Sequence, residues 1–104
     1  MKKEIKEKLI KERLDWMKTR INEMITKLNG STSLRIDIDE KTNWEDGKTK
    51  IYNLYVRSET LNRTHEFKSA KREKEIIEML GMLNGIENVL EFLIAEKNAL
   101  HTHS

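Results

Sequence analysis

The apolar residues of this 104-residue chain change their spacing twice. They recur every three or four positions over residues 2–29, they alternate with polar residues over 34–68, and they return to the first spacing over about 70–100. The first spacing places apolar side chains on one side of a helix, whereas alternation places them on one face of a strand. The sequence therefore predicts a helix, a group of strands and a second helix, in that order.

The first segment has the most regular pattern. Its apolar side chains are separated by four, three, four, three and four positions, which is the stripe of an amphipathic helix. Asn29-Gly30 supplies the stop, because glycine readily takes the left-handed conformation that ends many helices. We expect a helix over about 3–29, with a buried stripe of Ile10, Leu14, Met17, Ile21, Met24 and Leu28.

Two alternating stretches, "LRIDID" and "YNLYV", read as strands joined by a link that contains "WEDGK". A three-residue loop over residues 45–47 sets apolar residues opposite one another, whereas a two-residue turn would mix the faces. The longer loop also places Gly47 where a bulged turn needs a left-handed residue. The predicted register pairs Ile36 with Val56 and Ile38 with Leu54.

A third strand is expected at about residues 63–68, after a turn near Leu61-Asn62, and it offers Phe67 to the same apolar face. Ser69 is a suitable N-cap for the second helix, over about 70–100. The predicted fold is α+β, in the order α-β-β-β-α: a three-stranded antiparallel meander, spanning 34–68, with two long helices on one face. The length suits a single domain over residues 1–104.

The second helix has more apolar positions than one sheet requires. One seam at helical spacing runs from Met79 to Leu93 and suits the core. A second seam lies about 120–140° around the helix axis from the first, since each residue turns an α-helix by about 100°. Such a second seam, on helices longer than the strands, predicts self-association as a homodimer through Ile77, Gly81, Gly85 and Phe92.

Composition narrows the class of protein. Charged residues make up 37% of the chain, which indicates a small core and extended solvated faces. There is no cysteine, and neither a signal peptide nor a membrane-spanning apolar run is recognisable. We therefore expect a cytoplasmic protein with no membrane association.

Motifs for catalysis are lacking. The sequence has no phosphate-binding glycine loop, no nucleophile elbow and no metal-binding histidine pair. Asp37, Asp39 and Glu40 could bind Mg²⁺ or transfer protons, but a solvated strand face explains them more simply. We expect no enzyme activity, no cofactor and no metal.

Positive charge gathers before the second helix. Residues 48–72 carry seven Lys and Arg against two acids. Cations oppose the dipole at a helix start, while free N–H groups there attract anions. Two interpretations remain open: a solvated helix start with local ion pairs, or an anion- or partner-binding site formed by Arg63, Lys68, Lys71, Arg72 and Lys74.

The order α-β-β-β-α, with Lys71, Arg72 and Lys74 near the start of the last helix, is similar to the double-stranded RNA-binding domain. The similarity covers residues 5–95 as topology alone. The glycine-rich approach to the last helix is absent, the helices are longer, and the first strand loop is acidic. The resemblance implies a shared architecture rather than membership of that family.

The sequence favours a non-enzymatic binding protein, a small oligomeric protein-interaction or inhibitor module. The excess of Lys over Arg and the many Asn and Ile residues suit a phage or mobile-element protein. The alternative is a nucleic-acid-binding module that uses the basic residues before and at the start of the second helix. An enzyme that uses the acidic strand residues is the third hypothesis.

Overall fold

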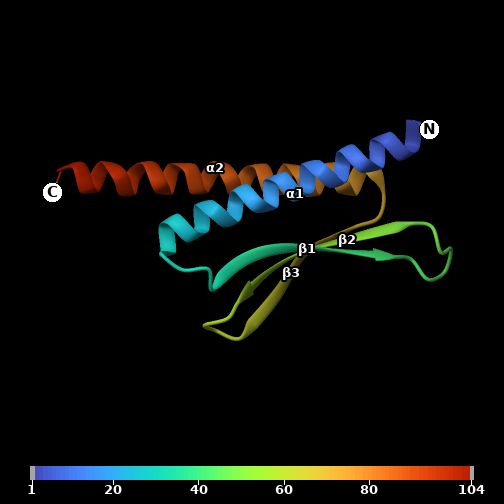
Figure 1. The fold of residues 1–104 in the computed structure, drawn as a ribbon, viewed down its shortest axis with the longest axis horizontal. Coiled ribbons are helices and arrows are strands. Elements are labelled where there is room, and N and C mark those ends of the chain that lie inside the picture. The colour runs from blue at the N-terminus through green and yellow to red at the C-terminus, as the bar shows by residue number, and fades with distance from the viewer. Residues whose placement is uncertain (1, 104) are drawn as a thin grey trace.

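A computed structural model describes the backbone of residues 2–103 and the side chains of residues 6 and 8–101. The strands form one antiparallel sheet in the order β1-β2-β3, and both helices lie on the same side of it (Figure 1). The α+β prediction is confirmed. In chain order the elements are α1 (Lys2–Asn29), β1 (Leu34–Thr42), β2 (Lys50–Ser58), β3 (Arg63–Ala70) and α2 (Glu73–His103).

The two helices run in the same direction, because the three antiparallel strands between them return the chain to the end where α1 began (Figure 1). α1 contacts β1, α2 contacts β3, and the helices contact each other. The 31 residues of α2 span about 46 Å, whereas strands of eight or nine residues span about 26–31 Å. The helix therefore continues past the sheet that supports it.

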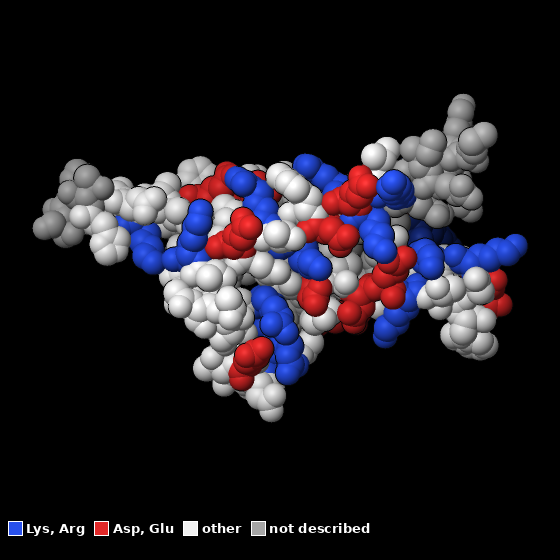
Figure 2. All heavy atoms as spheres, viewed as in Figure 1, with Lys and Arg blue, Asp and Glu red and all other residues white. Residues whose placement is uncertain are grey.

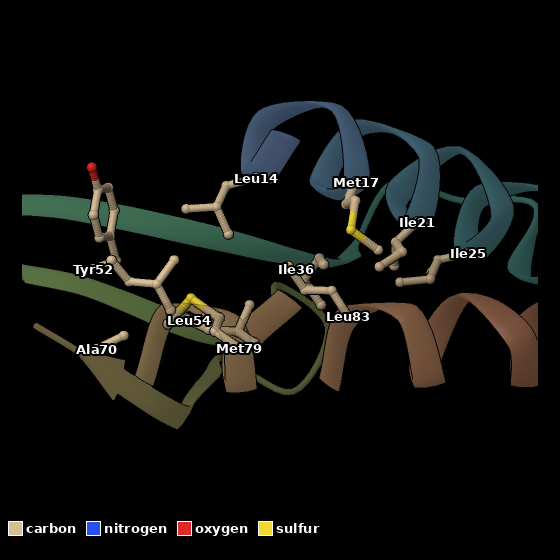
Figure 3. Close-up of a cluster of buried hydrophobic side chains, with 11 residues drawn as sticks. Leu14, Met17, Ile21, Ile25, Ile36, Tyr52, Leu54, Ala70, Met79 and Leu83 are labelled. Atoms are coloured by element: carbon tan, nitrogen blue, oxygen red, sulfur yellow. The ribbon is translucent and has the colours of Figure 1, made fainter. Parts of the chain in front are cut away.

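The core fills the angle between the helices and the sheet (Figure 3). α1 contributes most of its predicted stripe, with Ile21 fully buried, while Ile10 is only partly buried. β2 places Leu54 at the centre with no exposed surface. The largest fully buried side chains are Leu14, Met17, Ile21, Leu54, Met79 and Leu83.

The register of the first hairpin is confirmed. Ile36 pairs with Val56 and Ile38 pairs with Leu54. This alignment places all four side chains on the helix-facing side of the sheet, where Ile36 and Leu54 are buried and the other two pack against the core at partial burial.

The hairpin loop is held by the side chain of Asp46. Its carboxylate accepts hydrogen bonds from the N–H groups of Lys48 and Thr49, at 2.9 Å each, and from the Thr49 hydroxyl. These bonds lower the pKa of the Asp46 carboxyl to about 2. Gly47 follows with a φ of +63°, the left-handed conformation expected from the sequence.

The end of α1 is capped from two sides. The Gly30 N–H donates to the Thr26 carbonyl at 2.7 Å with Gly30 at a φ of +69°, which is a left-handed helix cap. The Lys97 ammonium of α2 donates to the carbonyls of Lys27 and Leu28 at 3.3 and 3.2 Å. A cation there interacts favourably with the negative end of the α1 dipole, and the contact links α2 to the last turn of α1.

The third strand differs in detail from the expectation. It extends to Ala70, so Ser69 is a strand residue and not an N-cap, and α2 begins at Glu73. The register shifts between Leu54 and Tyr55 of β2, so that Phe67 is an extra, bulged residue of β3 outside the regular pairing. Phe67 is 44% exposed and packs edge-on against His65, with 5.2 Å between ring centroids.

The outer edge of β1 is closed by Asn22 of α1. The Asn22 amide nitrogen donates to the Ile36 carbonyl at 2.9 Å, and its oxygen accepts from the Ile36 N–H at 2.8 Å. The side chain thereby replaces a neighbouring strand and satisfies backbone groups that an edge would otherwise present. Lys18, one helical turn earlier, reinforces the contact through Asp37 at 3.4 Å.

We expect Gly47→Val to lower the free energy of unfolding by about 1–2 kcal/mol, because a β-branched residue opposes the left-handed conformation. Within the described chain, no atom lies within 4 Å of a Cβ at Gly47, so the cost is conformational rather than steric. Gly47→Asn is the matched control and should cost less, since Asn tolerates this conformation. Equal losses in urea unfolding would contradict the assigned turn.

We expect Asn22→Ala to lower the free energy of unfolding by about 1–3 kcal/mol, because it removes two hydrogen bonds of about 0.5–1.5 kcal/mol each. The amide of Ile36 should also exchange with deuterium faster. Glu23→Ala, at the adjacent exposed position of α1, is the control and should change neither quantity appreciably. Unchanged exchange at Ile36 in the Asn22 variant would show that the edge is not closed by this side chain.

Candidate interaction surfaces

The structure separates the five basic residues that the sequence grouped together. Arg63 and Ala70 lie at opposite ends of β3, about 23 Å apart at 3.3 Å per residue. Arg63 borders a hollow of about 230 Å³ at the far end of the sheet. Lys68 forms an ion pair with Glu78 of α2 at 2.7 Å. Lys71, Arg72 and Lys74 remain together around the start of α2.

The start of α2 explains how cations are tolerated there. The Ile76 N–H donates to the Arg72 carbonyl at 3.0 Å, so Lys71 and Arg72 precede the first helical residue. The Glu75 carboxylate accepts from the N–H groups of Arg72 and Lys71 at 3.1 and 3.3 Å. The chain thus satisfies these donors with its own anion, as the glutamate of a capping box does.

Hydrogen bonds from the Arg72 and Lys71 N–H groups lower the pKa of the Glu75 carboxyl below its usual value of 4.5. A carboxyl whose pKa is lower in the folded state stabilises the fold above its unfolded pKa, and this stabilisation is lost as pH falls through the folded value. We expect NMR titration of Glu75 to give a pKa below 4.5. A measured Glu75 pKa of 4.5 or higher would contradict the assignment of Glu75 as a capping residue.

Glu75→Gln separates the hydrogen bonds from the charge. Glutamine can still accept from both N–H groups, whereas Glu75→Ala cannot. We expect the Gln variant to retain most of the stability and to lose the part of its pH dependence that Glu75 contributes, while the Ala variant loses both. Thermal unfolding between pH 3 and 7 measures the difference.

Three lysines converge on one hollow between α1, β2 and the start of α2. The hollow has a volume of about 190 Å³. Two of its lysines, Lys48 in the hairpin loop and Lys50 at the start of β2, are not singled out by any pattern in the sequence. The register of β2 with β3 places the hairpin loop beside the turn before α2, and it thereby brings these two lysines close to Lys71. The lining residues are Ile10, Lys48, Thr49, Lys50, Tyr52, Lys71 and Ile76.

Positive and negative side chains are intermixed over the face shown in Figure 2, rather than separated into one basic surface. Ion pairs account for much of this mixing. Arg20 joins α1 to α2 through Glu87 at 2.9 Å and Glu91 at 3.1 Å, and it also lies over the Trp16 ring. Further pairs between elements are Lys6–Glu73, Lys11–Glu40 and Lys18–Asp37.

The acidic residues of β1 fall on two faces of the sheet. Glu40 pairs across the strands with Tyr52, on the helix side, and lies 3.1 Å from Lys11. Asp37 and Asp39 lie on the other face, where both accept from the Tyr55 hydroxyl, at 3.2 and 3.5 Å. In the part of the chain that the structure describes, no group of three His, Asp or Glu residues could hold a metal ion.

Burial and polar neighbours together set the pKa values of Asp37 and Tyr55. Partial burial would raise the pKa of the Asp37 carboxyl, but the Ile38 N–H and Lys18 lower it below its usual value overall. Burial and the two carboxylates raise the pKa of the Tyr55 hydroxyl. The result is an ionised Asp37 and a protonated Tyr55, which can hold the strands together but do not form an acid–base pair near neutral pH.

The side of α2 that faces away from the core carries apolar residues between Ile77 and Phe92, about half the length of the helix, with Glu78 and Asn88 exposed among them. Ile77 is 60% exposed and Phe92 is 78% exposed, and Gly81 and Gly85 lie between them. Val89, which the sequence reading did not include, is 59% exposed on the same side. We call this side the outer face of α2; it consists of Ile77, Gly81, Gly85, Val89 and Phe92.

In comparisons with family models, curated proteins and solved structures, no match to this chain was found. Among residues 2–103, neither helix is long and apolar enough to cross a membrane.

Proposed function

We propose that this protein acts by binding and not by catalysis, as a small oligomeric protein-interaction or inhibitor module. The outer face of α2 is the observation that carries the proposal. Its large side chains are more than half exposed, although water disfavours apolar surface by roughly 25 cal/mol per Å². Single exposed apolar residues are common on proteins, but three large ones gathered on one side of a helix, with two glycines between them, suit an interaction surface.

The charged residues support this reading because many of them already have partners within the chain. Lys68 is paired with Glu78, Arg20 with two glutamates, and Lys18 with Asp37. Such pairs are worth little to stability individually, but they leave alternating charge on the surface. A surface of that kind favours selective protein contacts over broad attraction to an anion.

A nucleic-acid-binding module is the second candidate, and the hollow lined by Lys48, Lys50 and Lys71 favours it. Three ammonium groups around one depression could hold a backbone phosphate. Lys50 lies 3.8 Å from Glu40, which offsets part of this charge. We therefore rank this candidate below protein binding.

Two pairs of substitutions distinguish the candidates. Val89→Glu with Phe92→Glu changes the outer face of α2, while Lys48→Glu with Lys71→Glu changes the lysine hollow. Each protein is immobilised and exposed to extract of its native cell, with and without nuclease. We expect a protein partner to survive nuclease, to be lost with the first pair of substitutions and to be kept with the second.

Titration with duplex DNA and RNA of defined sequence supplies the opposite test. The second candidate would be favoured if the lysine substitutions weaken this binding. The slope of log K against log salt concentration should then fall by about 0.9 for each duplex DNA phosphate contact that is lost. Thermal unfolding of both variants checks that the fold is intact. Nucleic acid binding together with nuclease-sensitive capture would overturn the protein-binding proposal.

A further inference from the structure

We propose that the outer face of α2 is the contact between two copies of this chain, packed antiparallel around a two-fold axis at Gly85. This inference rests on the proposed function, in that it takes the same face as a protein-binding surface and names its occupant. A symmetric pair requires that residues equally far from the axis, in opposite directions along α2, suit each other. The residues of α2 meet this requirement in charge and in size.

The charges match around Gly85. Lys74 lies eleven residues before it and Glu96 lies eleven residues after it, and both are exposed. Eleven residues are about three turns and about 16.5 Å, so both side chains lie within about 20° of the direction of Gly85. In the antiparallel pair, Lys74 of each copy faces Glu96 of the other.

The sizes match as well. Ile77 is eight residues before Gly85 and Phe92 is seven residues after it, so the two largest side chains of the face lie within one residue, about 1.5 Å along the axis, of direct opposition. Glu78, the residue directly opposite Phe92, is engaged by Lys68 of β3 at 2.7 Å in its own chain. Gly81 and Val89 are each four residues from the axis, which sets a small residue against a branched one. Within the described chain, no atom lies within 4 Å of a Cβ at Gly81 or Gly85, so both are open to a second backbone.

A parallel pair would lose these matches. Each residue would then face its own copy, which sets Lys74 against Lys74 and Glu96 against Glu96. Like charges that face each other are unfavourable, and two Phe92 rings would have to share one position. The self-complementarity of the face therefore specifies the antiparallel register.

Sedimentation of the parent protein and of charge variants tests the proposal. We expect a dimer at tens of micromolar, and a dissociation constant raised about tenfold or more by Lys74→Glu, which replaces two attractive pairs with two repulsive ones. Glu96→Lys should do the same, and the double exchange Lys74→Glu with Glu96→Lys should restore the parent value. A monomeric parent, or a double exchange that fails to restore association, would overturn the inference.

Cysteine crosslinking tests the register independently, because the chain has no cysteine of its own. Gly85→Cys brings two thiols together at the axis and should form a covalent dimer under mild oxidation. Val89→Cys should not, since its two copies lie about 12 Å apart along the helices. Equal crosslinking of the Gly85→Cys and Val89→Cys variants would indicate a parallel contact and would contradict the proposal.

The proposed function can be judged separately. If the parent chain is monomeric but the outer-face substitutions abolish capture of a partner, the self-association inference fails while protein binding stands. If the chain dimerises as described and captures only nucleic acid, the inference stands while protein binding to another partner fails.

Discussion

The difference in length between α2 and the sheet controls the rest of this structure. A helix of about 46 Å can be buried along one side only as far as strands of about 26–31 Å and a parallel neighbour reach. Burial on its inner side is complete at Met79 and Leu83 and only partial at Ile86 and Leu90. Within the described chain, the apolar residues Ile77, Val89 and Phe92 on the opposite side of α2 are more than half exposed, because a helix packed on one side leaves its other side to solvent.

Charge in this protein is used locally. Acidic residues of α2 pair with cations that come from α1 and β3, and Glu75 accepts hydrogen bonds from the N–H groups of Lys71 and Arg72 just before the helix. A helix start preceded by lysine and arginine therefore need not be an anion site. The lysine hollow combines separate segments: Lys48 comes from the hairpin loop, Lys50 from the first position of β2 and Lys71 from the turn before α2.

Patterns within one element were predictable from the sequence, whereas placements that depend on several elements were not. The hairpin register followed from setting Ile36 and Ile38 opposite apolar partners, and the helix stop followed from Gly30. The start of α2 was misplaced by three residues, because Ser69 satisfies an N-cap pattern but pairs with Asn53 in the sheet. The separation of Arg63 from Lys71 was implicit in the predicted third strand, which places them at its opposite ends, but the gathering of the three lysines could not be seen before the strand register was known.

The edges of the sheet give a physical reason for association through a helix rather than through a strand. Asn22 occupies the backbone groups of Ile36, so β1 offers an interrupted edge to a further strand. β3, at the other edge, carries a bulge at Phe67 and charged side chains at Arg63 and Glu66, features that oppose strand pairing. With both edges protected in these ways, the proposed contact of a second chain with the outer face of α2 is a side-chain contact that needs no free strand edge.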